Sequence, residues 1–577
     1  MNANGRATER RRRITRRAIP LVAVAFLAFV VGAVAGSSAG GPNAEAFLQA
    51  WQRVDIDAMY AELTPDARAQ YSLKRFQNTY ADTVRTATIE SISVGEVSEQ
   101  GDSVIAPVSF TTQAFGPLQG QLALPISDGK VAWTPNLAYP GLAADERLSR
   151  RTRAPQRAPI LAADRSPLAR GPAAARVIGT DATAVVGEVG QPSGAQAKDL
   201  AARGFPPGSL TGTSGLELAF DNRLAGRPGG QLVAVSAAHE NRLRGGRILA
   251  SSQPVPGKAV RTTIDPTLQE SAVSALGSLY GGVAVLDAKT GEVRALAGLG
   301  YSAPQPPGST FKMITATAAL DAGVVKTSDT FPVESSNSEI GREIPNAHDE
   351  LCGGTFAESF AMSCNTVFAP LGARVGGPKL VATSELYGFN SPPALFDPRA
   401  TAILDPPQSR IPPEMTDSVE GGESAIGQGR ELATPLEMAT VAQTIANKGV
   451  RMPTPIAKDP ALQPDLKPVK VTSPETAQTM RELMIGVVTG GTGVAAALPG
   501  VQVAGKTGTA ELGPSALQPG QDASEAEQDI DAWFASFAPA NDPKLVVAVM
   551  VVNASGDGGT VAAPVARQVL ATGLGIE

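Results

Sequence analysis

The stretch Pro306-Pro307-Gly308-Ser309-Thr310-Phe311-Lys312 places a serine where a proline- and glycine-rich turn gives way to a helical run that ends at Gly323. Three residues of helix turn about 300°, so Ser309 and Lys312 share one face. A desolvated lysine can lose its proton and act as general base for a serine hydroxyl. Free amide groups at the helix start can bind a developing oxyanion. The alternative interpretation is a capped helix with a surface lysine, because such a pair arises about once by chance in a chain of this length.

The composition also favours chemistry of this kind. The 577 residues contain only two histidines and two cysteines. This scarcity excludes a His-rich or Cys₄ metal site and leaves only two histidines that could serve in a Ser-His-Asp triad. A hydrophobic content of 43 % is enough for several buried cores, and the length predicts roughly three or four domains. We expect neither a metal ion nor a cofactor.

The N-terminal segment combines a basic cluster with an apolar run. Residues 1–17 hold seven arginines and one glutamate, a net charge of +6 in a chain whose total is −6. The acidic remainder disfavours nucleic acid as a partner. Residues 18–36 are almost wholly apolar and long enough to cross a hydrocarbon core of about 30 Å. This pattern predicts a cytoplasmic tail (1–17), an uncleaved single-pass anchor (18–36) and an extracytoplasmic remainder. The competing interpretation is a cleaved signal peptide, because Ala33-Val34-Ala35 fits a cleavage site.

Beyond the anchor, changes in pattern predict three further domains. Residues 42–149 show helical spacing followed by short strand-like runs, which predicts a small α+β domain. Residues 150–261 begin with Arg/Pro/Ala-rich stretches and continue as scattered short strands, so we expect a mostly-β domain. Residues 262–577 open on a capped helix and a hairpin and close on three strands and a helix, which predicts one interleaved α/β domain. The fold class is therefore multidomain α+β.

The two cysteines, Cys352 and Cys364, are candidates for a disulfide in an extracytoplasmic protein. A bridge over so short a loop would stabilise the fold by roughly 3 kcal/mol in the chain-entropy model. Two buried free thiols are an almost equally good interpretation.

Two further motifs follow Ser309 in a defined order. Ser363-Cys364-Asn365 lies in an apolar, helix-like stretch over 356–375, where buried polar side chains would need partners. Lys506-Thr507-Gly508-Thr509 lies on a predicted strand, where glycine permits close approach of a ligand and the other residues supply donors for a carboxylate. A second Lys-Thr-Gly at 289–291 occupies a hairpin turn, and a second Ser-x-Asn at 335–337 lies in a polar segment. We therefore prefer the first pair of motifs.

These three elements in this order resemble the penicilloyl-serine transferases, and in particular the class B (monofunctional) penicillin-binding proteins. Arg157-Ala158-Pro159-Ile160 and Gly215-Leu216-Glu217 resemble signatures of that family's non-catalytic pedestal, or dimerisation-type, domain, although the family usually has glycine where Ala158 stands. Residues 42–149 are similar to the nuclear-transport-factor-two-like domain of methicillin-resistance-type members. The resemblance implies that 150–261 is the pedestal and that 262–577 is a transpeptidase domain with a serine β-lactamase-like fold.

The resemblance also implies a role for each motif residue. Ser309 is the expected nucleophile, Lys312 its base and Ser363 a proton relay to the leaving amine. Asn365 is expected to hold the substrate's peptide, and Lys506 to tune the electrostatics around Ser363. Substrate binding is expected from Thr507, Gly508 and Thr509, with the backbone amides of Ser309 and Thr509 as the oxyanion hole.

The implied reaction is peptidoglycan D,D-transpeptidation, in which Ser309 attacks a D-Ala-D-Ala stem peptide and an amine of a neighbouring strand accepts the acyl group. Acylation by β-lactams follows from the same chemistry. The sequence leaves too little room for a glycan-polymerising domain, so a separate glycosyltransferase is an expected partner. Alternatives are a D,D-carboxypeptidase and a membrane-anchored sensor or scaffold without turnover. A β-lactamase is disfavoured because no Glu-x-x-x-Asn pair lies between Asn365 and Lys506.

Overall fold

The computed structural model describes residues 42–236, 246–399, 406–514 and 528–576. The chain divides into two compact units, which are described separately. Unit 1 comprises Met1–Arg157, Gln191–Thr211 and Ala225–Gly257, and unit 2 comprises Ala158–Gly190, Gly212–Leu224 and Lys258–Glu577. The segment 150–261, expected as one domain, contributes to both units.

The expected cytoplasmic tail and membrane anchor precede Pro42, the first described residue. The tail (1–17) and the anchor (18–36) both lie outside the described residues. Within the described ranges, every helix is too short or too polar to cross a membrane.

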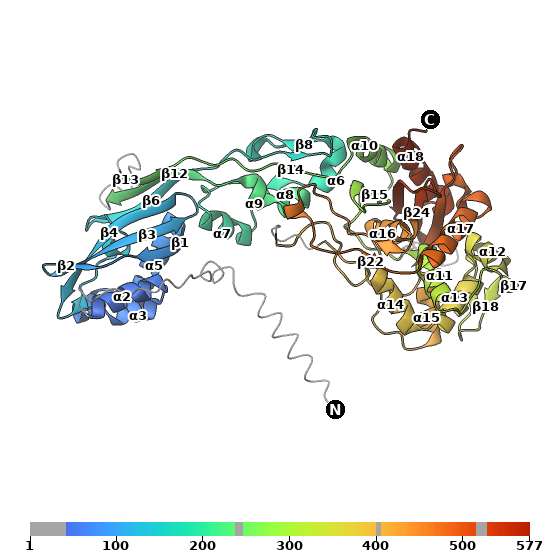
Figure 1. Ribbon diagram of the computed structural model, residues 1–577, viewed down its shortest axis with the longest axis horizontal. Helices are drawn as coiled ribbons and strands as arrows, with labels where there is room; N and C mark the ends of the chain where they lie inside the picture. Colours follow the sequence, from blue (N-terminus) through green and yellow to red (C-terminus); the bar gives the residue numbers. More distant parts are fainter. Residues whose placement is uncertain (1–41, 237–245, 400–405, 515–527, 577) are drawn as a thin grey trace, which may run out of the picture. The chain divides into compact units, whose positions relative to one another are not determined.

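Unit 1 packs short helices against an antiparallel sheet, and α5 lies beside β1 (Figure 1). Local chemistry explains how its helices begin. Ser72 caps α5 by accepting a hydrogen bond from the Arg75 amide, and Thr64 caps α4 with Pro65 in its first turn. The helices are α2 (Pro42–Gln52), α3 (Ile56–Ala61), α4 (Pro65–Gln70), α5 (Leu73–Ala87) and α7 (Gly194–Ala202).

The sheet of unit 1 has the order β1-β3-β4-β5, with β2 on β3. Alternate residues of β3 are buried, as the strand period of two requires. The core behind the sheet is rich in aromatic residues, with Phe76 and Trp133 ring centroids 4.7 Å apart. The strands are β1 (Ile89–Val94), β2 (Ser98–Gln100), β3 (Ser103–Thr112), β4 (Gly116–Ser127) and β5 (Lys130–Val131). A second sheet has the order β13-β12-β6, from β6 (Glu146–Arg153), β12 (Gly229–Ser236) and β13 (Arg247–Ser252).

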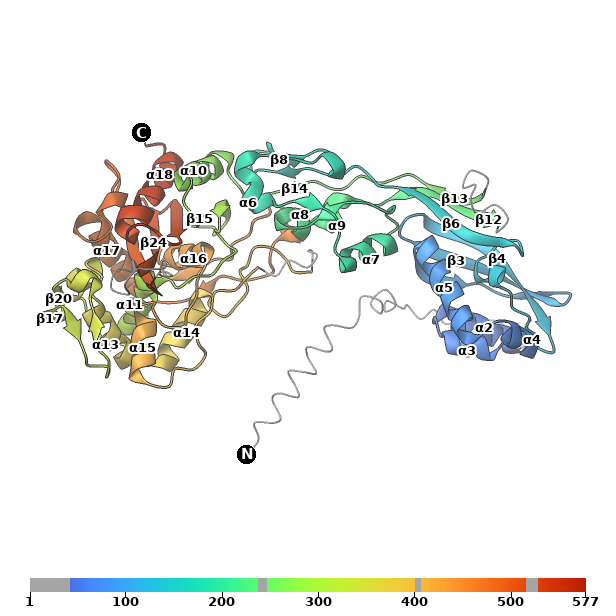
Figure 2. The ribbon, with the colours of Figure 1, turned by 180° about the vertical axis from the view of Figure 1, so that it is seen from behind.

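Unit 2 is built on a five-stranded sheet of order β16-β15-β25-β24-β23, of which β15 and β24 are labelled in Figure 2. All its neighbouring strands are antiparallel, so the predicted hairpin and the three predicted C-terminal strands are confirmed as parts of one sheet. The strands are β15 (Gly281–Asp287), β16 (Val293–Gly298), β23 (Ala504–Pro514), β24 (Gln528–Ala538) and β25 (Leu545–Val551). Because β25 is central, all seven of its residues are buried.

Helices cover both faces of this sheet. Val283 and Val285 of β15 pack with α10 (Pro266–Leu276) and α18 (Ala563–Leu574). The alternate residues Ala284 and Leu286 pack on the opposite side with α16 (Pro435–Ala446). Further helices of unit 2 are α11 (Lys312–Asp321), α12 (Phe356–Ala361), α13 (Asn365–Val375), α14 (Gly377–Tyr387), α15 (Ser418–Ala425) and α17 (Pro474–Gly490).

Unit 2 also contains small sheets. One has the order β14-β7-β8-β9, and beside it Arg176 forms a buried ion pair with Glu217 at 2.7 Å. Its strands are β7 (Ile160–Leu161), β8 (Pro167–Arg170), β9 (Val177–Ile178) and β14 (Val260–Arg261). Another pairs β17 (Thr330–Glu334) with β20 (Cys352–Thr355), just before α12.

Candidate active site

Ser309 and Lys312 lie at the start of α11, as the motif predicts. Ser309 is in a 3₁₀ turn, Gly308–Phe311, that leads directly into α11, where Lys312 is the first residue. Ser309 is partly exposed, whereas Lys312 has no exposed surface. Among the described residues the Ser309 hydroxyl has no hydrogen-bond partner, so it is free to meet a ligand. The interpretation of Lys312 as a surface lysine is wrong, because α11 packs into the core on all sides.

The Lys312 ammonium connects the first motif to the second. Its Nζ donates to the backbone oxygen of Ser363 at 2.7 Å and to Asn365 Oδ1 at 2.7 Å, and it lies 3.3 Å from Ser363 Oγ. Asn365 Nδ2 donates to the Pro345 oxygen at 3.0 Å, so both ends of its amide are held. The motif that lies 54 residues after Ser309 in the sequence is thus adjacent to it in space.

The stretch over 356–375 is not one continuous helix. It divides into α12 and α13, and Ser363 lies between them with a left-handed backbone (φ 63°). The contact with Lys312 accounts for the break, because the Ser363 carbonyl is bound by an ammonium group rather than by an amide of the next turn. The break aims Ser363 Oγ at the two lysines.

Lys506 reaches the same serine from the opposite side. It lies on β23, the edge strand of the sheet, and its Nζ donates to Ser363 Oγ at 2.9 Å and to the Thr507 carbonyl at 3.0 Å. Thr509, three residues after Lys506 on β23, is partly exposed. The third motif therefore completes a cluster with the other two.

Two glycines allow the Ser309 turn and β23 to approach closely. Gly308 has φ 51°, and a Cβ there would lie 2.5 Å from the Thr509 oxygen. A Cβ on Gly508 would lie 2.8 Å from the Pro307 oxygen and 3.0 Å from the Thr310 amide nitrogen. Any side chain at either position would force the strand away from Ser309. The backbone amides of Ser309 and Thr509 thus belong to two segments in direct contact.

Burial sets the electrostatics of the cluster. Burial and the nearby positive charge of Lys506 hold the pKa of Lys312 well below its usual range. Burial lowers the pKa of Lys506 to about 7. An aromatic ring lies near each ammonium, Phe368 at 5.5 Å from Lys312 Nζ and Phe360 at 5.7 Å from Lys506 Nζ. A lysine with a lowered pKa is available as a base near neutral pH, which is what activation of a serine requires.

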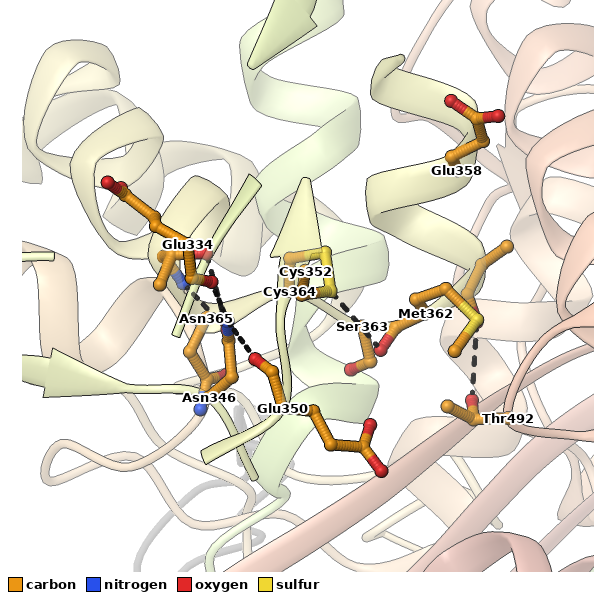
Figure 3. The surroundings of a disulfide bond; sticks show 12 residues. Glu334, Asn346, Glu350, Cys352, Glu358, Met362, Ser363, Cys364, Asn365 and Thr492 are labelled. Atoms are coloured by element: carbon orange, nitrogen blue, oxygen red, sulfur yellow. Dashed lines mark hydrogen bonds between the residues drawn. A yellow bond between two sulfur atoms is a disulfide. The ribbon is translucent and has the colours of Figure 1, made fainter. Parts of the chain in front are cut away.

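The two cysteines form a disulfide beside the second motif. Figure 3 shows the bond between Cys352 and Cys364 beside Ser363 and Asn365. The bond joins the first residue of β20 to the N-cap residue of α13, with Cα atoms 5.4 Å apart. The interpretation as two free thiols is therefore wrong. Cys364 does not take part in the lysine–serine contacts, as its position between the two motif residues predicts.

Sequence reasoning missed one residue of the site, Thr492. Its hydroxyl lies 2.5 Å from the Thr507 hydroxyl and 3.4 Å from the Ala361 oxygen. No local signal marks it, because it lies in a glycine-rich turn 15 residues before Thr507. The alternative Lys-Thr-Gly is confirmed as a hairpin turn, where exposed Lys289 pairs with Asp542 at 3.0 Å.

This arrangement suits acyl transfer through a serine. It offers an accessible hydroxyl, a buried lysine of lowered basicity, a second serine between two lysines, and closely packed backbone amides. Within the described part of the chain, no group of three or more histidine, cysteine or carboxylate side chains is arranged to hold a metal ion.

Family models match almost the whole described chain. A penicillin binding protein transpeptidase domain matches residues 281–571, a penicillin-binding protein dimerisation domain matches 152–262, and an NTF2-like N-terminal transpeptidase domain matches 39–146.

Relatives and solved structures agree with these models. The peptidoglycan D,D-transpeptidase PbpA of Mycobacterium tuberculosis is 33 % identical over 383 residues, which cover 55 % of this chain and 73 % of PbpA. PbpA of Mycolicibacterium smegmatis is 32 % identical, over 59 % of this chain and 78 % of PbpA. The fold is similar to a ceftriaxone acyl-enzyme complex of penicillin-binding protein A from M. tuberculosis (27 % identity, TM-score 0.55, covering 73 % of this chain and 98 % of that one). It is similarly close to the D,D-transpeptidase domain of a peptidoglycan glycosyltransferase from Eggerthella lenta (27 % identity, TM-score 0.56, 73 % and 98 %).

The predicted family is thereby confirmed, and the three matched domains follow one another in the order that the motifs imply. The chain belongs to the penicillin-binding protein transpeptidases, with an NTF2-like N-terminal domain and a dimerisation domain preceding the transpeptidase domain.

Proposed function

We propose that this chain is a peptidoglycan D,D-transpeptidase that crosslinks stem peptides through an acyl-enzyme on Ser309. The observation that carries the proposal is the position of Lys312, which is fully buried and hydrogen-bonded to both Ser363 and Asn365 one helical turn from an accessible serine. The names of the relatives, and the acyl-enzyme complex of one of them, support this activity and acylation by β-lactams.

In the proposed reaction Lys312 takes the proton of Ser309 as the hydroxyl attacks the D-Ala-D-Ala carbonyl. The backbone amides of Ser309 and Thr509 stabilise the oxyanion. Ser363 lies within 3.3 Å of both lysine Nζ atoms and can pass the proton on to the leaving D-alanine amine. An amine from a neighbouring strand then attacks the acyl-enzyme, and the same groups act in reverse.

We further propose that Thr507, Gly508 and Thr509 bind the terminal carboxylate and that Asn365 orients the peptide. For Asn365 this requires an exchange of partners, because Lys312 and Pro345 hold both ends of its amide in the unliganded protein. Lys506 adds a positive charge beside the carboxylate site whenever it is protonated.

The apolar run over 18–36 and the arginines before it support a membrane-anchored protein with an extracytoplasmic catalytic unit. The Cys352–Cys364 disulfide fits such a compartment. The three matched domains account for most of residues 39–571, and none of them is described as polymerising glycan. We therefore propose that a separate glycosyltransferase supplies the glycan strands.

Labelling of the full chain with fluorescent penicillin tests the nucleophile. Ser309→Ala should abolish labelling, whereas Ser335→Ala, in the alternative Ser-x-Asn match, should label like the wild type. Labelling of Ser309→Ala at the wild-type rate would refute the assignment.

Product analysis with lipid-linked substrate and glycan strands tests the reaction. Dimeric muropeptides are the expected product. Release of D-alanine without dimers would show a carboxypeptidase, and penicillin labelling without either product would show a binding protein without turnover.

A further inference from the structure

Thr492 joins two of the three motif segments, although it belongs to none of them. It lies in the turn between α17 and the 3₁₀ turn Val494–Ala496. Its amide donates to the Ala361 oxygen at 3.1 Å, and Ala361 is the last residue of α12, two residues before Ser363. Its hydroxyl lies 2.5 Å from the Thr507 hydroxyl on β23. Figure 3 shows Thr492 beside Met362, next to Ser363.

The backbone around Thr492 leaves its hydroxyl little freedom. A Cβ on Gly491 would lie 2.8 Å from the Ala361 carbonyl carbon, and one on Gly493 would lie 3.1 Å from the Phe534 ring. These contacts and the amide hydrogen bond hold the turn against α12 and β24. The Thr492 hydroxyl is therefore presented to Thr507 by the fold rather than by a flexible side chain.

The geometry imposes a direction on the two hydroxyl protons. A carboxylate only accepts hydrogen bonds, so Thr507 must donate its single proton to bind one. The Thr507 oxygen must then accept the proton of Thr492, because two hydroxyls at 2.5 Å share one hydrogen bond. Without a carboxylate the pair can point the other way, with Thr507 donating to Thr492 and Thr492 donating to the Ala361 oxygen at 3.4 Å.

Thr507 has no other hydroxyl partner among the described residues, and its exposed fraction is 5 %. Replacing Thr492 by an apolar side chain would leave the Thr507 oxygen without a donor at the moment when its proton is committed to the ligand. A buried, unsatisfied oxygen weakens the very hydrogen bond that binds the carboxylate.

We propose that Thr492 is a positioning residue for carboxylate recognition: it donates to Thr507 and so directs the Thr507 proton toward the terminal carboxylate of the donor peptide. The proposal rests on the proposed function and adds to it a residue outside the three motifs. Through Thr492, the turn at 490–493 contributes to the preference for donor peptides that end in a free carboxylate.

The test compares two thioester donors that differ only in their terminal group, a carboxylate or a primary amide, on the full chain. In Thr492→Val, kcat/KM for the carboxylate donor should fall about fivefold to tenfold, mostly through KM, because one hydrogen bond is lost. The amide donor should be almost unaffected. Thr492→Ser keeps the hydroxyl and should restore the carboxylate donor to within about twofold.

Thr489→Val is the matched control, because Thr489 is exposed and, within the described ranges, its hydroxyl donates only to carbonyls of its own helix. It should behave like the wild type with both donors. Equal loss for both donors in Thr492→Val, or no loss for either, would overturn the proposal while leaving the proposed function intact. A wild-type chain that reacts with neither donor would instead refute the proposed function, and this inference with it.

Discussion

Removal of the Cys352–Cys364 disulfide should weaken both the stability of unit 2 and the reactivity of Ser309. The bond closes a loop with a sequence separation of 12. In the chain-entropy model, a loop of this length stabilises the folded state by about 3 kcal/mol relative to the open chain. For a unit as large as unit 2, a loss of that size lowers the melting temperature by about 5 °C.

The effect on reactivity follows from the position of the bond. Cys364 directly follows Ser363, whose left-handed backbone costs about 1–2 kcal/mol for a residue with a side chain. That backbone is held by the disulfide, by the Lys312 contact and by the hydrogen bond from the Cys364 amide to the Ser359 oxygen at 2.9 Å. Without the disulfide we expect Ser363 to relax toward an ordinary conformation. Misplacement of a relay group lowers the acylation rate by about tenfold or more.

The assay uses the double variant Cys352→Ala/Cys364→Ala in the full chain. Calorimetry measures the melting temperature, and fluorescent penicillin measures the second-order rate constant of acylation. Treatment with a reductant is the matched control, since it should reproduce both losses in the wild type and change nothing in the double variant. A double variant with the wild-type melting temperature and acylation rate would refute the reasoning.

Two further predictions follow from charge and burial. Acylation requires neutral Lys312, so its rate should fall as the pH drops through the lowered pKa of this lysine. Lys506→Met removes a neighbouring positive charge, so the pKa of Lys312 should rise. The acid limb of the pH–rate profile should then move to higher pH. A limb that moves to lower pH would contradict the assignment of Lys312 as the base. Arg176→Ala should destabilise the fold by about 3 kcal/mol in denaturant unfolding, because it breaks a buried ion pair with Glu217 at 2.7 Å and the Arg176 hydrogen bonds to the Gly171 and Ala158 oxygens. Lys289→Ala, which breaks an exposed pair, should leave stability almost unchanged, and equal losses in the two variants would argue against the role of burial.

Local patterns predicted the elements of unit 2 well where the physical cause is local. Asp265 accepts from the amides of Thr267 and Leu268 at the start of α10, as its N-cap position and the following proline indicate. The hairpin of β15 and β16 follows from apolar strands around a turn, and Gly291 in that turn has φ 73°. Each of these features depends on residues within a few positions of one another.

Prediction failed where a distant group decides the backbone. The apolar pattern continues through 356–375, so periodicity alone gives no reason to end a helix at Ala361. The break at Ser363 is stabilised by Lys312, which lies 51 positions away in the sequence. The domain expected at 150–261 matches one family domain over 152–262, although its strands divide between the two compact units: β6 and β12 pair within unit 1, and β7 and β14 pair within unit 2.

The sequence by itself determined the family, the order of the three motifs and the one-turn spacing of Ser309 and Lys312, because helix geometry and motif chemistry depend on residues that are close together in the sequence. Only the tertiary structure decided that Lys312 and Lys506 both lie within 3.3 Å of Ser363 Oγ, that Cys352 is bonded to Cys364, and that Thr492 faces Thr507. The tertiary structure also decides the lowered pKa values of Lys312 and Lys506. They arise from burial among side chains of distant segments, and no local run of residues specifies which segments those are.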